Sequence, residues 1–210
     1  MSGKMEEQRL SRKEQEKLWR RKHVLSAALE LFSKKGYHNI SMRQIAKKAE
    51  FAIGTLYKFF RNKEDLYKEI VREMAEEYHR RLMEPLEREN DAIAAIEGYI
   101  NAKLDLFSDH KSSLLLYLSE TQSPSFNISA GLDKEMQKLY NELMDRLAKI
   151  FESAIKRKKI RKRDPRALAI SLEGLTNSFL FYWLEKPEEH PFEKDASTIA
   201  EIFLKGVSYE

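Results

Sequence analysis

The chain has 210 residues, of which 42% are hydrophobic and 34% charged, with no cysteine and a formal net charge of +4. This composition excludes a disulfide framework and thiol chemistry, and no apolar run is long enough to span a bilayer. The charged N-terminus lacks the apolar segment of a signal peptide, so we expect a soluble cytoplasmic protein with no membrane association. Only seven glycines and five prolines occur, and the hydrophobic residues repeat about every 3.6 positions, so we predict an all-α fold.

Charge is distributed unevenly along the sequence. Residues 1–70 contain 17 Lys and Arg against 9 Asp and Glu, a net charge of +8. The remainder contains 38 − 17 = 21 against 34 − 9 = 25, a net charge of −4. A basic N-terminal part on an acidic remainder favours one polyanion-binding end. Ordinary variation of charge on solvated helices is the alternative, and the charge alone does not decide between them.

Residues 1–17 are mostly charged and polar. We expect them to form a frayed tail or an exposed helical extension. A solvated tail is favoured over one that reaches a DNA minor groove. The first well-patterned helix is predicted from Trp19 to Lys35, with an apolar stripe on one face and Gly36 as its C-cap.

Residues 41–60 contain two short helical patterns separated by a tight turn. Ser41 is a suitable N-cap for the first helix, which carries four apolar residues on one face: Met42, Ile45, Ala46 and Ala49. The second buries Leu56 and Phe60 and leaves three side chains outward: Thr55, Tyr57 and Lys58. Two helices joined this closely form a helix-turn-helix, whose second helix enters the DNA major groove.

This region resembles the DNA-binding region of the tetracycline-repressor (TetR) family of bacterial regulators. The resemblance covers roughly residues 20–70 and rests on Ala27, Ala28, Leu31, Phe32, Lys35-Gly36-Tyr37, Ser41, Ile45-Ala46, Ala49, Gly54-Thr55-Leu56-Tyr57, Phe60, Asn62-Lys63 and Leu66. Three positions differ from the family pattern: Gln44 replaces an acid, Glu50 a glycine and Phe51 a small aliphatic residue. Because glycine adopts positive φ at little cost, Glu50 predicts a slightly reshaped turn rather than a lost motif.

The resemblance implies that the residues at positions 41, 55, 57 and 63 hold DNA phosphates. Hydroxyl and ammonium groups suit phosphates and base edges, and two further polar residues lie at the start of the first helix of the motif. The predicted DNA-binding residues are Ser41, Arg43, Gln44, Thr55, Tyr57, Lys58 and Lys63. For each of them a solvated side chain is the alternative.

The remaining sequence predicts longer helices. One is capped by Asn62 and reaches about Glu84, where Pro85 disturbs it. The others are expected at residues 91–109, 111–121, 132–159, 165–186 and 193–207, with breaks at 123–131 and 187–191. With the resemblance, this pattern predicts three parts: a charged tail at 1–17, a helix-turn-helix DNA-binding domain at 18–65, and a helical effector-binding and dimerisation domain at 66–210.

The helix predicted at 165–186 is apolar almost all round, so it must be buried on both sides. A central core helix or a subunit interface would satisfy this requirement. The resemblance favours the interface, since the last two helices of the family form a four-helix bundle with their symmetry mates. The predicted dimer interface residues are Leu172, Leu175, Phe179, Trp183, Ile199 and Phe203.

The resemblance also implies an effector cavity among the C-terminal helices. Large side chains at helical spacing are more often core than pocket, yet binding sites are mostly apolar with a few polar groups. We therefore predict an apolar or amphipathic effector. The predicted pocket residues are Tyr78, Tyr99, Phe107, Tyr117, Glu120, Glu173 and Asn177.

Other chemistry is not indicated. The five histidines lack metal-ligand spacing, and there is no Gly-rich phosphate loop or nucleophile elbow. We therefore expect no metal, no cofactor and no enzymatic activity. The basic run at 156–163 is interpreted as a solvated helix end, with a second contact to DNA or an acidic ligand as the less favoured interpretation.

The sequence therefore predicts a bacterial or archaeal transcriptional regulator, most simply a ligand-responsive repressor that binds a near-palindromic operator as a homodimer. Two alternatives remain open. One is an architectural protein that binds DNA without sequence preference. The other is a helical enzyme or ligand-binding protein with a vestigial helix-turn-helix.

Overall fold

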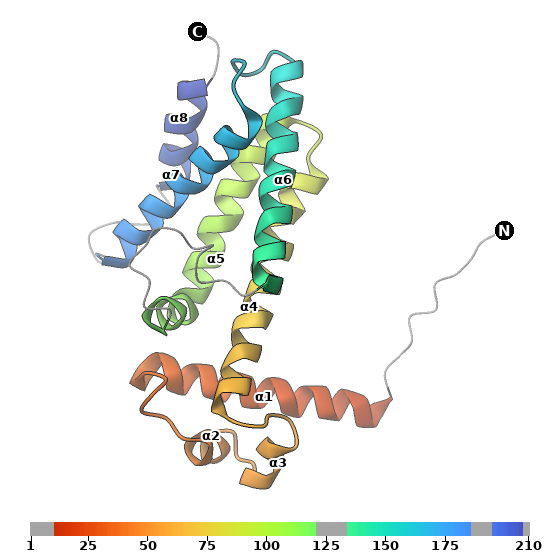
Figure 1. Cartoon of the computed structure of the whole chain (residues 1–210), viewed down its shortest axis with the longest axis vertical. Helices are drawn as coiled ribbons and strands as arrows, with labels where there is room; N and C mark the ends of the chain where they lie inside the picture. Colours follow the sequence, from red (N-terminus) through yellow and green to blue (C-terminus); the bar gives the residue numbers. More distant parts are fainter. Residues whose placement is uncertain (1–10, 121–133, 186–194, 208–210) are drawn as a thin grey trace, which may run out of the picture. The chain divides into compact units, whose positions relative to one another are not determined.

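The computed structural model of the chain describes residues 11–120, 134–185 and 195–207, and the side chains of all of these except 112–120 and 185. This described part contains eight α-helices and no β-strand, which confirms the predicted all-α fold (Figure 1). The helices are α1 (Arg12–Lys35), α2 (Met42–Lys48), α3 (Ile53–Tyr57), α4 (Lys63–Arg88), α5 (Ala92–Glu120), α6 (Lys134–Lys156), α7 (Pro165–Glu185) and α8 (Asp195–Val207). The chain divides into two compact units, Met1–Val71 and Arg72–Glu210.

The N-terminal unit holds α1, α2, α3 and the start of α4. Helix α1 begins seven residues before the predicted start at Trp19, because Ser11 and Glu14 form a capping box. In this box the Glu14 backbone N–H donates to the Ser11 hydroxyl, and the Ser11 backbone N–H donates to the Glu14 carboxylate. Such reciprocal capping satisfies two backbone donors and stabilises a helix start. The predicted tail is therefore helical from Arg12 onward.

Two prolines occupy different positions in their helices: Pro85 lies inside α4, whereas Pro165 is the first residue of α7. Asn62 caps α4 as predicted, with its side chain accepting from the backbone N–H of Asp65. The helix does not end at Pro85 but continues to Arg88. Helix α7 begins at Pro165, and the preceding Asp164 side chain accepts from the backbone N–H of Arg166 at 2.9 Å, so an aspartate caps a helix whose first residue is proline.

Helix α5 merges two of the predicted helices. The predicted division at residue 110 is present as a kink, since His110 has non-helical angles of φ −120° and ψ 22°. The predicted breaks at 123–131 and 187–191 lie outside the described residues.

The C-terminal unit is a helical bundle with a single apolar core. Helices α6 and α7 pack on each other, and α5 contacts α6, α7 and α8. The core includes Tyr99, Ile100, Leu147, Phe151 and Leu172, each at most 1% exposed. Because α5 lies against three other helices, side chains on it reach partners throughout this unit.

One close approach in this bundle depends on the absence of a side chain. A Cβ atom added at Gly98 in α5 would lie 2.8 Å from the Cβ atom of Pro85 in α4. We predict that Gly98→Ala lowers the free energy of unfolding by about 1–3 kcal/mol through overpacking. Helix propensity alone predicts a gain of about 1 kcal/mol, so urea unfolding distinguishes the two by sign. Gly206→Ala in α8, which meets nothing within 4 Å, serves as the matched control and should not destabilise.

Candidate DNA-binding site and a buried polar cluster

Helices α2 and α3 form the helix-turn-helix that the sequence predicts. The apolar face of α2 is buried as expected, with Ile45 fully inaccessible and Ala49 1% exposed. Leu56 of α3 is fully buried and Phe60 is 3% exposed. The Phe60 backbone N–H donates to the carbonyl of Leu56 at 2.9 Å, so a last helical turn follows α3. These contacts fix the orientation of α3 and leave its opposite face exposed.

The turn between the two helices keeps its geometry without glycine. Glu50 has a positive φ of 56°. The backbone N–H of Glu50 donates to Lys47 at 3.3 Å, and that of Phe51 donates to Ala46 at 3.0 Å. These two bonds are the pair of a Schellman motif, which normally has glycine at the left-handed position. The motif is thus retained as predicted, and the reshaping is confined to a non-glycine residue in the left-handed region.

Ser41 and Gln44 are engaged with each other at the start of α2. The Gln44 backbone N–H donates to the Ser41 hydroxyl at 3.3 Å, and the Ser41 backbone N–H donates to the Gln44 side chain at 2.8 Å. The Ser41 hydroxyl lies 2.8 Å from the same Gln44 oxygen. Both side chains therefore position the start of α2, a role that the sequence interpretation did not give to Gln44.

Lys63 also has internal partners. Its ammonium donates to the carbonyl of Tyr37 at 2.8 Å and to that of His38 at 3.4 Å, and lies 4.2 Å from the centroid of the Tyr37 ring. A lysine has three donors, so one remains for a phosphate. Lys63 consequently joins the start of α4 to the segment between α1 and α2.

The outward face of α3 is the most accessible part of the motif. Tyr57 is 55% exposed and Ile53 is 38% exposed, while Thr55 is half-buried and Lys58 is exposed. Arg43, at the start of α2, is exposed as well. Ile53 was not among the predicted contacts, although an apolar residue at the start of a recognition helix could have indicated it, because such residues contact thymine methyl groups.

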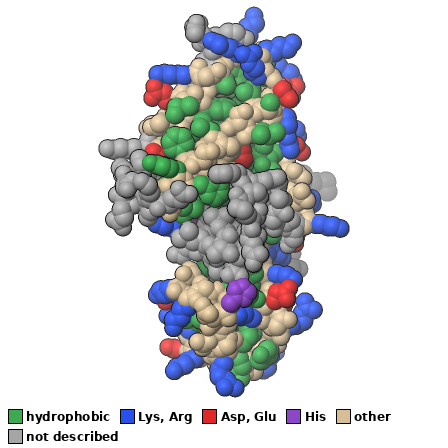
Figure 2. All heavy atoms as spheres, turned by 60° about the vertical axis from the view of Figure 1, so that its left-hand side comes forward, with side chains coloured by type: hydrophobic (Ala, Val, Ile, Leu, Met, Phe, Trp, Pro, Cys, Tyr) green, Lys and Arg blue, Asp and Glu red, His purple; other side chains and the backbone are tan. Residues whose placement is uncertain are grey.

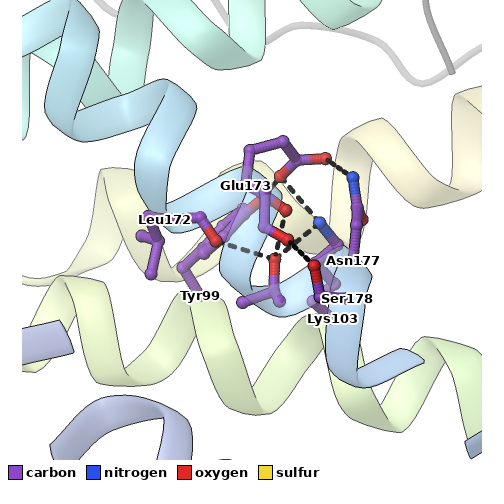
Figure 3. A network of polar contacts seen from close by, with 8 residues as sticks. Tyr99, Lys103, Leu172, Glu173, Asn177 and Ser178 are labelled. Carbon is purple, nitrogen blue, oxygen red and sulfur yellow. Dashed lines mark hydrogen bonds and ion pairs between the residues drawn. The ribbon is translucent and has the colours of Figure 1, made fainter. Parts of the chain in front are cut away.

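The C-terminal unit contains a buried cluster of polar side chains between α5 and α7 (Figure 3). The Lys103 ammonium lies 2.7 Å from the Glu173 carboxylate and donates to the Thr176 hydroxyl at 2.9 Å. The Tyr99 hydroxyl donates to the same carboxylate, and the Asn177 amide donates to it at 3.3 Å. We call these five residues the buried polar cluster. All are at least nine-tenths inaccessible.

The cluster holds its charges as an ion pair. Burial alone raises the pKa of the Glu173 carboxyl, but the Lys103 charge and three donated hydrogen bonds outweigh it and hold that pKa below its ordinary value. Burial lowers the pKa of the Lys103 ammonium, and the Glu173 carboxylate opposes that change. Burial, together with the adjacent carboxylate, raises the pKa of Tyr99 well above its ordinary value. The tyrosine is therefore a neutral donor to the carboxylate.

The predicted pocket residues fall into two groups in the structure. Tyr99, Glu173 and Asn177 meet in the buried polar cluster, whereas Phe107 lies edge-on to Trp183, with ring centroids 6.2 Å apart. The side chains of Tyr117 and Glu120 lie outside the described residues. The sequence interpretation missed Lys103 and Thr176. Lys103 could have been noticed, since it follows Tyr99 by four positions and so interrupts the apolar face of α5.

Tyr78, the remaining predicted pocket residue, has a buried hydroxyl with no hydrogen-bond partner among the described residues. Its ring lies 6.3 Å from that of His110 at the kink in α5. Burial raises the pKa of Tyr78 to about 12. An unpartnered buried hydroxyl costs stability and calls for an explanation in function or strain.

This contrast between two tyrosines makes a prediction. We expect Tyr78→Phe to raise the free energy of unfolding by about 1 kcal/mol, because it removes an unsatisfied polar atom. We expect Tyr99→Phe to lower it by about 1.5–3 kcal/mol, because it removes a hydrogen bond to a charged group. Urea unfolding followed by circular dichroism measures both variants. Equal destabilisation of the two would show that the Tyr78 hydroxyl has a partner in the protein.

The predicted interface residues are mostly core residues of the single chain. Leu172 and Ile199 are fully inaccessible, Phe203 is 6% exposed and Trp183 is 9% exposed. Leu175 and Phe179 are half-buried against the same core. These six residues therefore lie on the inner side of α7 and α8 in the single chain. Their part in a dimer interface stays a prediction.

A different set of residues forms the outer side of α7 and α8. Figure 2 shows hydrophobic side chains along the middle of this face and charged ones toward its edges. Its exposed large residues are Ile170, Tyr182 and Ile202, at 58%, 49% and 52%. Gly174 lies among exposed small residues of α7, and a Cβ atom there would meet nothing within 4 Å. We call these four residues the outer α7–α8 face.

The basic run at 156–163 is partly engaged within its own unit. Arg157 donates to the carbonyl of Asn90 at 3.1 Å, and Lys159 pairs with Asp91.

Among the described residues, no group of three or more potential ligands could hold a metal ion. Of the helices in residues 11–120, 134–185 and 195–207, none is long and apolar enough to cross a membrane.

Comparison with known proteins agrees with this geometry. Residues 24–70 match the family described as bacterial regulatory proteins, tetR family. The uncharacterized HTH-type transcriptional regulator YhgD of Bacillus subtilis is 26% identical over 90% of this chain and 97% of its own length. The fatty acid metabolism regulator protein of the same organism is 22% identical over 88% and 93%. Among solved structures, Bacillus subtilis FadR in complex with stearoyl-CoA superposes with a TM-score of 0.69 at 20% identity, covering 88% of this chain and 98% of that one.

A helix-turn-helix with an exposed recognition helix, in a chain that transcriptional regulators match over nearly its whole length, defines a DNA-binding transcriptional regulator. Its N-terminal unit, over residues 24–70, is similar to the TetR family.

Proposed function

We propose that the protein is a homodimeric repressor that binds a near-palindromic operator and releases it when an amphipathic effector binds the C-terminal unit. The observation that carries this proposal is the helix-turn-helix with Ile53 and Tyr57 exposed on α3. A single short helix in one groove gives modest affinity, whereas two related by a two-fold axis read successive grooves of a palindrome. The site of action would be the cytoplasm of a bacterium or archaeon.

The outer α7–α8 face supports the dimer. Exposed apolar residues that lie in a contiguous patch usually mark an interaction surface. Small residues between them allow two helices to approach closely, and a two-fold contact lets the same patch meet itself. We therefore assign the interface to Ile170, Gly174, Tyr182 and Ile202.

The effector class is supported by the relatives and by the C-terminal unit. A curated relative over nearly the whole chain is a fatty acid metabolism regulator, and a protein of the same fold holds stearoyl-CoA. The aromatic contact of Phe107 and Trp183 lies along α5 and α7 from the buried polar cluster. An amphipathic acyl compound matches this combination, with its chain among the aromatic side chains and its polar group toward the Tyr78 hydroxyl or Lys103. Binding would lower DNA affinity through its preference for one conformation.

A DNA-binding experiment tests this function. An operator is first selected from a random duplex library, and affinity is then measured across a salt series for the operator and for mixed-sequence DNA. We expect the operator to bind at least about a thousandfold more tightly. Equal affinities would favour the architectural alternative. Absence of DNA binding at low salt, with acyl-CoA binding retained, would favour the alternative with a vestigial helix-turn-helix.

Tyr57 gives a residue-level test of the same proposal. We predict that Tyr57→Ala weakens operator binding about tenfold, which corresponds to one lost contact of 1–3 kcal/mol. Tyr57→Phe separates the hydroxyl from the ring, because only a phosphate or base hydrogen bond needs the hydroxyl. Lys34→Ala, a change on the exposed last turn of α1, is the control and should leave affinity within about twofold. Unchanged binding by Tyr57→Ala would remove this residue from the interface.

The effector is tested by calorimetry with stearoyl-CoA and with free stearate, followed by release of the labelled operator. We expect release by one of the two compounds in the wild-type protein. We expect Tyr78→Phe, which removes only an unpartnered hydroxyl, to keep the fold and to weaken effector binding, because the ligand loses this polar contact. No binding of either compound or of shorter acyl homologues would contradict the proposed effector class.

A further inference from the structure

The first two turns of α1 make no use of the core. Every residue from Ser11 to Trp19 is exposed, although a capping box starts the helix firmly at Arg12. Leu18 is 44% exposed and Trp19 is 59% exposed. A helical extension with an exposed tryptophan is unexplained by the packing of the N-terminal unit.

Trp19 belongs to an aromatic cluster that reaches the start of the recognition helix. Its ring stacks on His23, with centroids 5.3 Å apart and planes within 14°, and meets Phe51 edge-on at 6.3 Å. The rings of His23 and Phe51 are 5.8 Å apart, and the Arg20 guanidinium lies 5.9 Å from the centroid of Phe51. Phe51 is two residues before Ile53, the first residue of α3. The cluster therefore fixes the extension of α1 beside the end of α3 that is expected to enter the major groove.

The extension is basic. Residues 12–22 contain six Lys and Arg against two Glu. Glu14 is occupied by the capping box, and Glu16 pairs with Arg20 at 2.5 Å. Arg12 has no ion-pair partner among the described residues. It lies seven residues before Trp19, so the two side chains share one stripe of the helix to within about 20°.

We propose that this extension is a second DNA-contacting element, with Arg12 and Trp19 touching the sugar–phosphate backbone that flanks the groove read by α3. The DNA backbone is the occupant that the observations favour, because the surface is cationic, carries the exposed residue Trp19, whose indole N–H is a hydrogen-bond donor, and is continuous with the helix-turn-helix. Arginine suits phosphate oxygens through its bidentate fork. Such contacts position the protein without reading sequence. The inference rests on the DNA binding proposed above.

The chain offers a matched control for this proposal. Lys17 lies on the same exposed turns but two residues from Trp19, which places it about 200° around the helix, on the opposite side. Arg12→Ala and Lys17→Ala remove the same charge from the same segment. A long-range effect of net charge would therefore change both variants alike, whereas a direct contact changes only the first.

The affinity test uses the full-length protein and a mixed-sequence 30-base-pair duplex, because backbone contacts do not need an operator. We expect Arg12→Ala to weaken binding several-fold and to reduce the salt slope by about one per subunit. Lys17→Ala should leave the slope unchanged within error. Equal slopes for Arg12→Ala and Lys17→Ala would overturn the proposal. Failure of the wild-type protein to bind this duplex at low salt would instead contradict the proposed function itself.

A second test reads Trp19 directly. The sequence has only two tryptophans, so Trp183→Phe leaves Trp19 as the sole indole. We expect the duplex to reduce quenching of its fluorescence by iodide at least twofold. Unchanged quenching in a complex shown by anisotropy to be fully formed would overturn the contact by Trp19, whatever the affinity of the alanine variants.

Discussion

Replacing Lys103 with methionine should lower the free energy of unfolding by about 3–5 kcal/mol. The substitution keeps the length of the side chain but removes the charge that lies 2.7 Å from Glu173. The carboxylate then remains buried with only the neutral donors Tyr99 and Asn177 around it. An uncompensated buried charge is far more costly than the absence of the whole pair. Urea unfolding at pH 7 measures the loss.

A double variant that removes both charges distinguishes the net contribution of the ion pair to stability from the destabilisation caused by leaving one charge unpaired. In Lys103→Met/Glu173→Leu both charges are gone, so we expect most of the lost stability to return. Lys138→Met, which removes an exposed lysine from α6 of the same unit, is the control and should change stability little. If the double variant has a free energy of unfolding as low as that of Lys103→Met, the side chains of the buried polar cluster are needed for packing, and restoring charge balance is not enough.

The stabilities of the wild-type protein and of Lys103→Met should respond to acidification in opposite directions. In the wild-type protein the pKa of Glu173 is held below its ordinary 4.5. Its contribution to stability is therefore complete above about pH 4.5 and is lost as the pH falls through the folded-state value. Without Lys103, burial raises that pKa above 4.5 instead. The folded variant then binds the proton first, and its stability should rise as the pH falls from 7 toward 5. A wild-type pH profile in the variant would contradict the ion pair.

The N-terminal unit could be predicted from sequence in more detail than the rest. Its turn and caps depend on neighbours within four or five residues, as with Asn62, which caps α4 as expected. Glu50 stands where the family pattern has glycine, and its backbone has the positive φ that a glycine at this position indicates. The internal capping bond of Gln44 was missed because the same residue type suits both a cap and a base contact.

The C-terminal unit depends on long-range contacts, and there the sequence was less informative. Lys103 and Glu173 are seventy positions apart, so no local pattern pairs them. The sequence also did not show which side of α7 faces the core, for a different reason. Leu172 and Ile170 are equally apolar, and only the packed bundle shows that the first faces the core and the second faces outward.

Gly174 therefore offers the sharpest test of the proposed dimer. We predict that Gly174→Arg separates the subunits and weakens operator binding at least about a hundredfold, because the second recognition helix then binds independently of the first. A side chain at this position meets nothing within 4 Å in the single chain, so the subunit fold should survive. Native mass spectrometry reports the stoichiometry, and circular dichroism confirms the helical content.

The control is Gly174→Ala, which adds one methyl group, favours the helix and should leave a dimer. Ile170→Glu, at the exposed position one turn earlier, should act like the arginine variant, since it places a charge on the same apolar surface. If both charged variants remain dimers with unchanged operator affinity, the subunits associate through another surface. If they become monomers that still bind the operator as tightly as the wild-type protein, one recognition helix is sufficient and the operator need not be a palindrome.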